Sequence, residues 1–392
     1  MCIRDSANET ALEHYQVALD SLDHLPETQD NQEQRFQILY ACADIYMRLG
    51  HWEQARRHLL SLDEVAQRLA RPSYRAETHL SWARLYTRLS EWMLAEEHAR
   101  QAVTLLREIE GKEALARALN SLGGVLWYQG QRQQALLCYQ ESLTLCRQTG
   151  DQAQMGRTLS NLAVLYQELG EHQLALRCLE QALDIARAQG DRRLEWIALN
   201  NLAVIHMDLG EYRESLHCCQ AVEELCRLTG DKRGLSSTLG NLGLTYRGLG
   251  DAEAALEAYQ RSMALDRELK NLGGAANTLR EIGHLHCELG LFEQGLREIE
   301  AALQEHRSLG NRTEEGYDLI GLAYAYRCLG QYEQALNHAR KAAAIHMELE
   351  NDYGLSRAWL EQGLAEAELG EYDQAIRTLE QAAFVAAELR PL

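Results

Sequence analysis

The sequence predicts an all-α protein, a right-handed superhelical α-solenoid of about nine helical hairpins with a leading half-repeat. Three observations predict this fold class. A glycine recurs every 40 residues along most of the chain, and the apolar residues on either side of it follow helical spacing. Only three prolines occur among 392 residues, so long stretches can remain helical. A fixed period of this length is typical of stacked repeats, in which each unit buries its apolar side against its neighbours.

The recurring glycine is predicted to end the first helix of each hairpin, helix A, and to let the chain turn into the second, helix B. The positions concerned are Gly50, Ser90, Gly130, Gly170, Gly210, Gly250, Gly290, Gly330 and Gly370, of which eight are glycine. An aromatic residue often follows two positions later and a small residue five positions later, as with Tyr212 and Ser215. A second break, Gly-Asp or Gly-Asn, ends helix B and caps the next helix A, as at Gly190 and Asp191.

Within one repeat, the apolar positions predict two amphipathic helices that face each other. Helix A carries Leu159, Leu162, Ala163, Tyr166 and Leu169, and helix B carries Ala175, Leu176, Leu179, Ala182, Leu183 and Ile185. Small residues such as Ala163 and Ala175 allow two helices to approach closely, while the leucines fill the space around that contact.

This pattern resembles the tetratricopeptide repeat. The matching residues of one repeat are Leu162, Ala163, Tyr166, Gly170, Ala175, Leu179 and Ala182. The usual repeat has about 34 residues and closes with proline, whereas this unit has 40 and closes with Gly-Asp on a longer helix B. The longer variant is similar to the arrays of Pins-type spindle adaptors and of the C-terminal sensor regions of bacterial STAND signalling ATPases, including maltose-regulator-like activators.

The resemblance implies a protein- or peptide-binding scaffold without catalytic activity. It further implies the sensor or partner-docking arm of a larger bacterial signalling or transcription-regulating protein, with an extended peptide in the concave groove of the A helices. Two alternatives remain open: a free-standing adaptor, and a repeat domain that senses a small molecule.

Three segments are expected along the chain. Residues 111–392 hold seven regular hairpins, and residues 31–110 hold two degenerate ones. Residues 1–30 hold an orphan helix B of a truncated repeat. The residues from Met1 to Ser6 match, in reverse translation, a transposase adapter used in sequencing libraries, which favours an artefactual start; a natural leader is the alternative.

The formal net charge is −19, with 39 Lys and Arg against 58 Asp and Glu. Such a surface repels phosphate backbones, so direct nucleic-acid binding is disfavoured and a protein or peptide of basic character is attracted. The alternative is that the charge serves solubility alone. The ten cysteines include no CxxC pair, which favours a reducing, cytoplasmic compartment. No apolar run approaches the roughly 20 residues that a membrane span requires, and the oligomeric state is left open.

No motif for catalysis, a cofactor or a metal stands out, so neither catalytic residues nor a cofactor are predicted. The nearest candidate is the stretch that contains His284, His286 and Cys287. His286 falls in the repeat position that holds Tyr246 one repeat earlier, and is therefore expected to be a packed core residue. His284 points to the other face of the same helix, and a metal site would need both histidines.

The exposed face of the A helices is the predicted binding surface. An asparagine carboxamide offers a donor and an acceptor, as a peptide bond does, so asparagines one repeat apart could hold an extended segment by its backbone. The predicted peptide-binding residues are Asn120, Arg157, Asn161, Val164, Glu168, Asn200, Asn201, Val204, Asp208, Asn241, Leu244 and Arg247. Asn161, Asn201 and Asn241 resemble the asparagine ladders with which tetratricopeptide arrays clamp peptides. The alternative is that these asparagines bond the neighbouring repeat and only orient the stack.

Overall fold

The computed structural model describes residues 3–109 and 111–388. These residues form 19 α-helices and no strand, which confirms the all-α prediction. Within them, every helix is too short or too polar to cross a membrane. The chain divides into two compact units, Met1–Leu165 and Tyr166–Leu392, and each is described by itself below.

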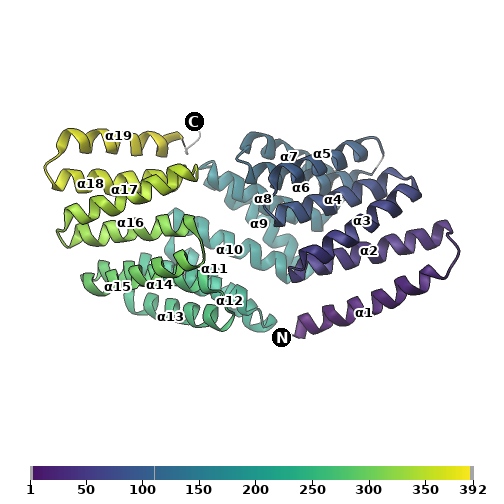
Figure 1. Ribbon diagram of the computed structural model, residues 1–392, viewed down its shortest axis with the longest axis horizontal. Helices are drawn as coiled ribbons and strands as arrows, with labels where there is room; N and C mark the ends of the chain where they lie inside the picture. Colours follow the sequence, from purple (N-terminus) through teal and green to yellow (C-terminus); the bar gives the residue numbers. More distant parts are fainter. Residues whose placement is uncertain (1–2, 110, 389–392) are drawn as a thin grey trace. The chain divides into compact units, whose positions relative to one another are not determined.

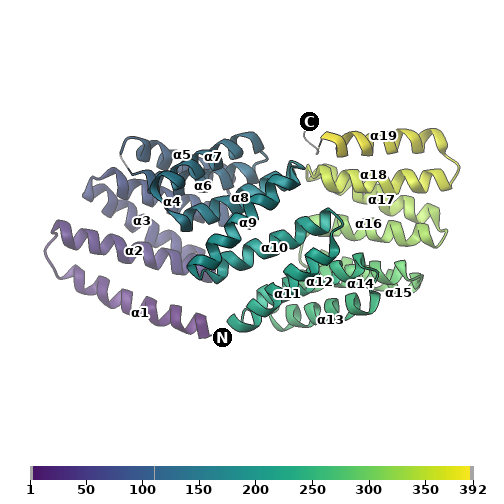
Figure 2. The same ribbon diagram turned by 180° about the vertical axis from the view of Figure 1, so that it is seen from behind.

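The first unit contains α1 (Ile3–Asp23), α2 (Gln29–Leu49), α3 (Trp52–Leu69), α4 (Pro72–Arg88), α5 (Trp92–Arg107), α6 (Lys112–Tyr128), α7 (Arg132–Thr149) and most of α8 (Gln152–Glu168). The second contains α9 (His172–Gln189), α10 (Arg192–Asp208), α11 (Tyr212–Thr229), α12 (Lys232–Gly248), α13 (Ala252–Glu268), α14 (Leu272–Glu288), α15 (Phe292–Ser308), α16 (Arg312–Cys328), α17 (Tyr332–Glu348), α18 (Asp352–Glu368) and α19 (Tyr372–Glu388). From α2 onward the even-numbered helices are A helices and the odd-numbered ones are B helices. Within each unit, consecutive helices lie side by side, as α4 and α5 do in the first unit and α16 and α17 in the second (Figures 1 and 2).

The corner between helices A and B has a left-handed backbone at every repeat. The eight predicted glycines have φ between 71° and 81°, and Ser90 has φ 59°. At Gly210, the Glu211 amide donates to the His206 carbonyl at 2.8 Å and closes the end of α10. A side chain strains this backbone region, so the prediction that glycine recurs there for geometric reasons is confirmed.

Seven junctions from helix B to the next helix A are also left-handed. Gly150, Gly190, Gly230 and Gly310 have φ between 68° and 75°, and Ala70, Lys270 and Glu350 adopt the same region without glycine. Asp191 Oδ1 accepts a hydrogen bond from Leu194 N at 3.1 Å, and Asn351 Oδ1 accepts one from Gly354 N at 3.0 Å. Asn311 Oδ1 likewise accepts one from Glu314 N at 3.4 Å, so the caps predicted at Asp191 and Asn311 are confirmed, and Asn351 caps its helix without a preceding glycine.

Small residues bring the two helices of a hairpin together, as predicted. A Cβ on Gly295 would lie 2.6 Å from the Gly283 carbonyl oxygen, so the backbones of α14 and α15 touch. In the α12–α13 hairpin, the Tyr259 ring lies directly on Gly243 and is only 1% exposed. A large side chain on helix B is thus matched by a glycine on helix A, which preserves close packing.

The first helix packs on α2 through Leu19 and Leu22, both buried. Met1 and Cys2 lie outside the described residues. The artefactual origin of Met1 to Ser6, and the division of the chain at residues 30 and 110, stay predictions.

Candidate functional site

The predicted asparagines pair with one another between neighbouring A helices. In the first unit, Asn161 Nδ2 donates to Asn120 Oδ1 at 3.1 Å; in the second, Asn241 Nδ2 donates to Asn200 Oδ1 at 3.0 Å. All four side chains are half-buried. In these two pairs, the asparagines therefore do form hydrogen bonds to the neighbouring repeat. It leaves one carboxamide oxygen and one NH2 group of each pair without another partner in the described part of the chain.

Two further predicted residues, Asp208 and Arg247, form similar contacts between neighbouring A helices, one or two turns beyond the asparagine pairs. Gln167 Nε2 donates to Asp208 Oδ2 at 2.6 Å, and Arg247 Nε donates to Glu288 at 2.9 Å. Arg247 also donates to Glu281 at 3.1 Å. Burial opposes the charge of Arg247, but Glu288 and Glu281 outweigh it and raise its pKa. Its charge is thus largely satisfied within the protein.

The structure divides the predicted binding residues between the two units. Asn120, Arg157, Asn161 and Val164 lie on α6 and α8 in the first unit; Glu168, Asn200, Asn201, Val204, Asp208, Asn241, Leu244 and Arg247 lie in the second. Each is exposed or half-buried, and Leu244 is 37% exposed. A surface that combines open amide groups with apolar side chains is present within each unit.

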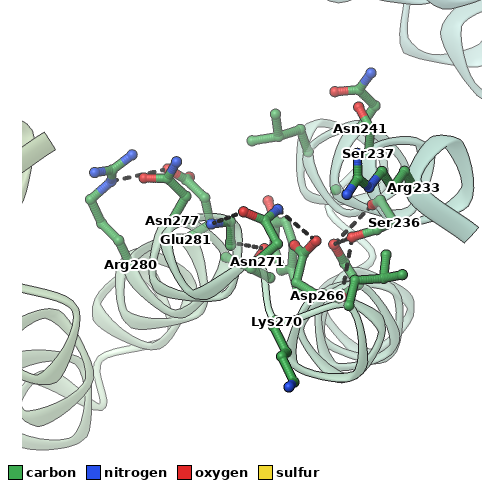
Figure 3. A pocket seen from close by; sticks show the side chains of 17 residues that line it. Arg233, Ser236, Ser237, Asn241, Asp266, Lys270, Asn271, Asn277, Arg280 and Glu281 are labelled. Carbon is green, nitrogen blue, oxygen red and sulfur yellow. Dashed lines mark hydrogen bonds and ion pairs between the residues drawn. The ribbon is translucent and has the colours of Figure 1, made fainter. Parts of the chain in front are cut away.

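A pocket of about 800 Å³ lies in the second unit between α12 and α14, with α13 beneath it (Figure 3). Neighbouring A helices such as α10 and α12, or α14 and α16, contact each other directly, whereas α12 and α14 barely touch. Small side chains help to open this gap: Gly240 stands where Asn200 and Arg280 stand in the adjacent repeats. Of the predicted residues, Asn241 and Leu244 line the pocket.

Sequence reasoning missed the rest of the pocket. The missed lining residues include Ser237, Asp266, Asn271 and Asn277. One signal was available in the period of 40: Asp266 occupies the helix B position held by Cys146, Ala186 and Cys226 in earlier repeats. Asp266 is the first charged or polar side chain after this run of apolar and cysteine residues, and His306 and His346 follow it in the next two repeats.

Arg280, at the pocket rim, is held by acidic side chains of the next repeat. Its Nη1 donates to Glu314 at 2.8 Å and to Asp318 at 3.1 Å, and its Nε lies 3.7 Å from Glu281. Burial opposes its charge, but Asp318, Glu281 and Glu314 raise the pKa of Arg280. This guanidinium links α14 to α16, and because acidic side chains already neutralise its charge, it is poorly suited to bind a charged ligand.

Two polar atoms of the pocket residues are buried without a hydrogen-bond partner among the described residues, the Tyr259 hydroxyl oxygen and Asn277 Oδ1. Burial and Glu281 raise the pKa of Tyr259, and the nearby Arg247 guanidinium opposes this shift in part. The phenol therefore stays protonated at neutral pH. Buried polar atoms without partners are rare in folded proteins and often indicate a ligand or water site.

The stretch around His286 is structural, as predicted. His286 is 6% exposed, and its Nδ1 lies 2.6 Å from Glu298 Oε2. Burial lowers the pKa of His284 and raises the pKa of Cys287 to about 11. Across residues 3–109 and 111–388, no three His, Cys, Asp or Glu side chains are grouped to hold a metal ion.

The tetratricopeptide repeat is the family whose sequence pattern matches this chain. One family model of the tetratricopeptide repeat matches residues 74–148, 115–188, 194–268, 274–348 and 319–383, and a second family model matches residues 37–61. Among curated proteins, none is similar enough in sequence to count as a relative.

Three solved structures illustrate the similarity of fold. A Rap protein complexed with competence and sporulation factor superposes with a TM-score of 0.66 at 14% identity, covering 92% of this chain and 99% of that one. The apo form of the quorum sensor NprR from B. thuringiensis gives 0.68 at 14% identity, covering 91% and 99%. A STAND protein with a tetratricopeptide repeat sensor from Pyrococcus horikoshii gives 0.60 at 14% identity, covering 90% of this chain and 52% of that one. At such identities the likeness shows the fold alone.

Proposed function

Because the chain belongs to the tetratricopeptide repeat family, we propose that it binds an extended polypeptide segment along the exposed face of its A helices. In this proposal the chain is the sensor or partner-docking arm of a larger bacterial signalling or transcription-regulating protein. It acts by binding and has no catalytic step.

The asparagine pairs carry this proposal. Asn120 with Asn161, and Asn200 with Asn241, each use one donor and one acceptor on each other. The remaining oxygen and NH2 group of each pair match the N–H and C=O of a peptide backbone. The exposed Leu244 beside the second pair offers an apolar contact for a ligand side chain.

The structural neighbours support a peptide ligand. One is a Rap protein complexed with competence and sporulation factor, and another is a quorum sensor. The STAND protein carries its repeats as a sensor, which supports the role of a sensing arm.

The charge and the cysteines suggest the kind of partner and compartment. A net charge of −19 favours a basic protein or peptide over a nucleic acid. The cysteines of the described residues are all free thiols, as expected in a reducing cytoplasm. The pocket between α12 and α14 also favours a second candidate function, the sensing of a small molecule.

The test is a screen of the full chain against a library of random linear peptides, followed by calorimetric titration of a selected peptide. The double variants Asn120→Ala with Asn161→Ala, and Asn200→Ala with Asn241→Ala, remove one asparagine pair each. We expect at least one double variant to weaken binding about tenfold or more, because two hydrogen bonds of about 1 kcal/mol are lost.

Asn337→Ala is the matched control, because Asn337 is exposed on α17, a B helix, and its loss should leave affinity unchanged. Thermal melting of each variant shows whether the stack itself is preserved. A selected peptide that both double variants bind as tightly as the unaltered chain does would refute this site.

A further inference from the structure

Asp266, at the end of α13, is a buried carboxylate without an ion pair. It is 6% exposed, and none of the ion pairs in the described residues includes it. Its Oδ1 accepts one hydrogen bond, from Asn271 Nδ2 at 2.9 Å. A buried carboxylate costs stability unless a cation or several donors compensate it, so the missing partner needs an explanation.

The next repeat shows what is missing. His306 occupies the equivalent position on α15, and its Nδ1 lies 2.6 Å from Asp318 Oδ2 on α16. The residue that corresponds to Asp318 in the repeat of Asp266 is Thr278. The Thr278 hydroxyl donates to the Gly274 carbonyl at 3.1 Å and leaves Asp266 uncompensated.

The second carboxylate oxygen of Asp266 faces the pocket. Asp266 is a lining residue, and its Oδ2 lies against Gly274, where a Cβ would come within 2.7 Å of it. Oδ2 accepts no hydrogen bond from the described residues, and it is not among their fully buried unpartnered atoms. Figure 3 shows the carboxylate beside Asn271, within the cluster of polar side chains that lines the cavity.

The other unpartnered polar atoms of the pocket can also accept hydrogen bonds, and the Tyr259 hydroxyl can donate one as well. Asn277 Oδ1 and the Tyr259 hydroxyl oxygen are buried without a partner, and Asn241 uses its NH2 group but not its Oδ1. A cavity with a carboxylate and several free acceptors suits a cation that carries several N–H donors.

The positive residues of the lining do not supply that cation. Arg280 is held by Glu314 and Asp318. The Lys270 side chain points away from Asp266 and Asn271 (Figure 3). Arg233 is exposed at the rim and forms no ion pair within the described residues.

We propose that this pocket binds the cationic head of a basic side chain, an alkyl-guanidinium or an alkylammonium, with Asp266 as its counter-ion. The inference deepens the proposed function, on which it rests: the bound peptide places one arginine or lysine between α12 and α14. The acidic surface of the chain draws such a peptide in, and Asp266 selects the position of its basic residue.

The test uses the full chain and two small probes whose ends are blocked and uncharged. One is N-acetyl-arginine methylamide, and the other is its citrulline counterpart, which has nearly the same shape without the side-chain charge. We expect the arginine probe to bind at least about tenfold more tightly than the citrulline probe. In Asp266→Asn this preference should vanish. The same variant without a probe should melt at a higher temperature, because an uncompensated buried charge is removed; a purely structural Asp266 predicts a lower one.

Two further variants serve as controls. Asp184→Asn makes the same charge change at an exposed position on α9 and should alter neither the preference nor the melting temperature. Arg233→Gln tests whether Arg233 neutralises Asp266 in solution. Under our proposal it leaves stability unchanged and strengthens binding of the arginine probe; a loss of stability would overturn the proposal.

The peptide library separates this inference from the proposed function. Selected peptides with Arg or Lys at one fixed position, whose binding depends on Asp266, support both. Peptides that bind without a basic residue and regardless of Asp266→Asn overturn the cation pocket and leave the proposed function intact. If free arginine, spermidine or the arginine probe binds through Asp266 and no peptide binds, the pocket takes a small cation and the proposed function is wrong.

Discussion

At the residue scale, the strongest constraint on this chain is the left-handed backbone at most of the turns between its described helices. Glycine meets it without strain at most positions, while Ser90, Lys270 and Glu350 adopt it with a side chain, at φ 59°, 57° and 51°. A residue with a Cβ loses about 1–2 kcal/mol in this region. Glycine recurs because the turn requires it, and each exception stores a little strain.

Glu350→Gly should therefore stabilise the chain. The relief of about 1–2 kcal/mol is partly offset by the greater freedom of glycine in the unfolded chain, which leaves a net gain of about 0.5–1 kcal/mol. Urea unfolding followed by circular dichroism measures it. Glu350→Ala keeps the Cβ and should match the unaltered chain; a less stable glycine variant would contradict the strain argument.

Gly243→Ala should destabilise the α12–α13 hairpin by about 1–3 kcal/mol, because the added methyl group overlaps the buried Tyr259 ring. Gly240→Ala, in the same helix, is the comparison: its Cβ would meet only Ser262 Oγ, at 3.9 Å. The alanine should stabilise the helix there by about 0.5–1 kcal/mol. Opposite shifts of the two unfolding midpoints are expected, and equal shifts would argue against the packing of Tyr259 on Gly243.

At the scale of elements, successive repeats are joined by contacts from a B helix to the next A helix, and the junction of α15 with α16 contains a fully buried pair. His306 on α15 and Asp318 on α16 are both fully buried, and Arg280 on α14 reaches the same carboxylate at 3.1 Å. Three consecutive helices thus share one carboxylate. Removing one member of a buried charge network leaves the others uncompensated, which is costlier than breaking a surface ion pair.

Asp318→Asn should lower the free energy of unfolding of this region by about 3–5 kcal/mol. Hydrogen exchange should quicken in α14 to α16 and change little in α2 to α7, because repeat arrays depend mainly on nearest-neighbour contacts. Glu314→Gln removes a half-exposed partner of the same Arg280 and should cost about 1 kcal/mol or less. Equal losses of unfolding free energy in the two variants would show that the burial of Asp318 does not increase its contribution to stability.

At the scale of the whole molecule, each unit buries histidines that favour the neutral form. In the first unit, burial lowers the pKa of His79 to about 4 and also lowers the pKa of His98, whose Nδ1 lies 3.0 Å from that of His79. In the second unit, burial lowers the pKa of His338 and of His346. Unfolded histidines bind a proton near pH 6.5. Acid therefore favours the unfolded state of both units.

Stability of the first unit should be fully present above about pH 6.5 and should fall as the pH drops toward 4, where folded His79 also takes up a proton. Hydrogen exchange in α4 and α5 at about pH 7 and pH 5, corrected for intrinsic rates, measures this loss. His79→Gln should reduce the pH dependence, and His24→Gln, an exposed residue of the same unit, should not. A steeper loss in His79→Gln would contradict the assignment.

The amino-acid sequence alone determined the helices, their boundaries and the type of repeat. These features depend on local backbone chemistry: Gly210 ends α10 because a left-handed turn needs glycine, and Asp191 caps α10 because its carboxylate reaches the free amides. Both effects act within a few residues, so the same residue types recur every 40 positions in the sequence. The core position of His286 could be predicted in the same way.

Only the tertiary structure decided how the binding surface is arranged. The pairing of Asn120 with Asn161 and of Asn200 with Asn241 depends on the rotation between neighbouring A helices, and the pocket depends on how far α12 stands from α14. These quantities result from many weak contacts between helices distant in sequence, such as Tyr259 on Gly243. No single residue in the sequence fixes such a distance, and for that reason the pocket around Asp266 could not be predicted from the sequence.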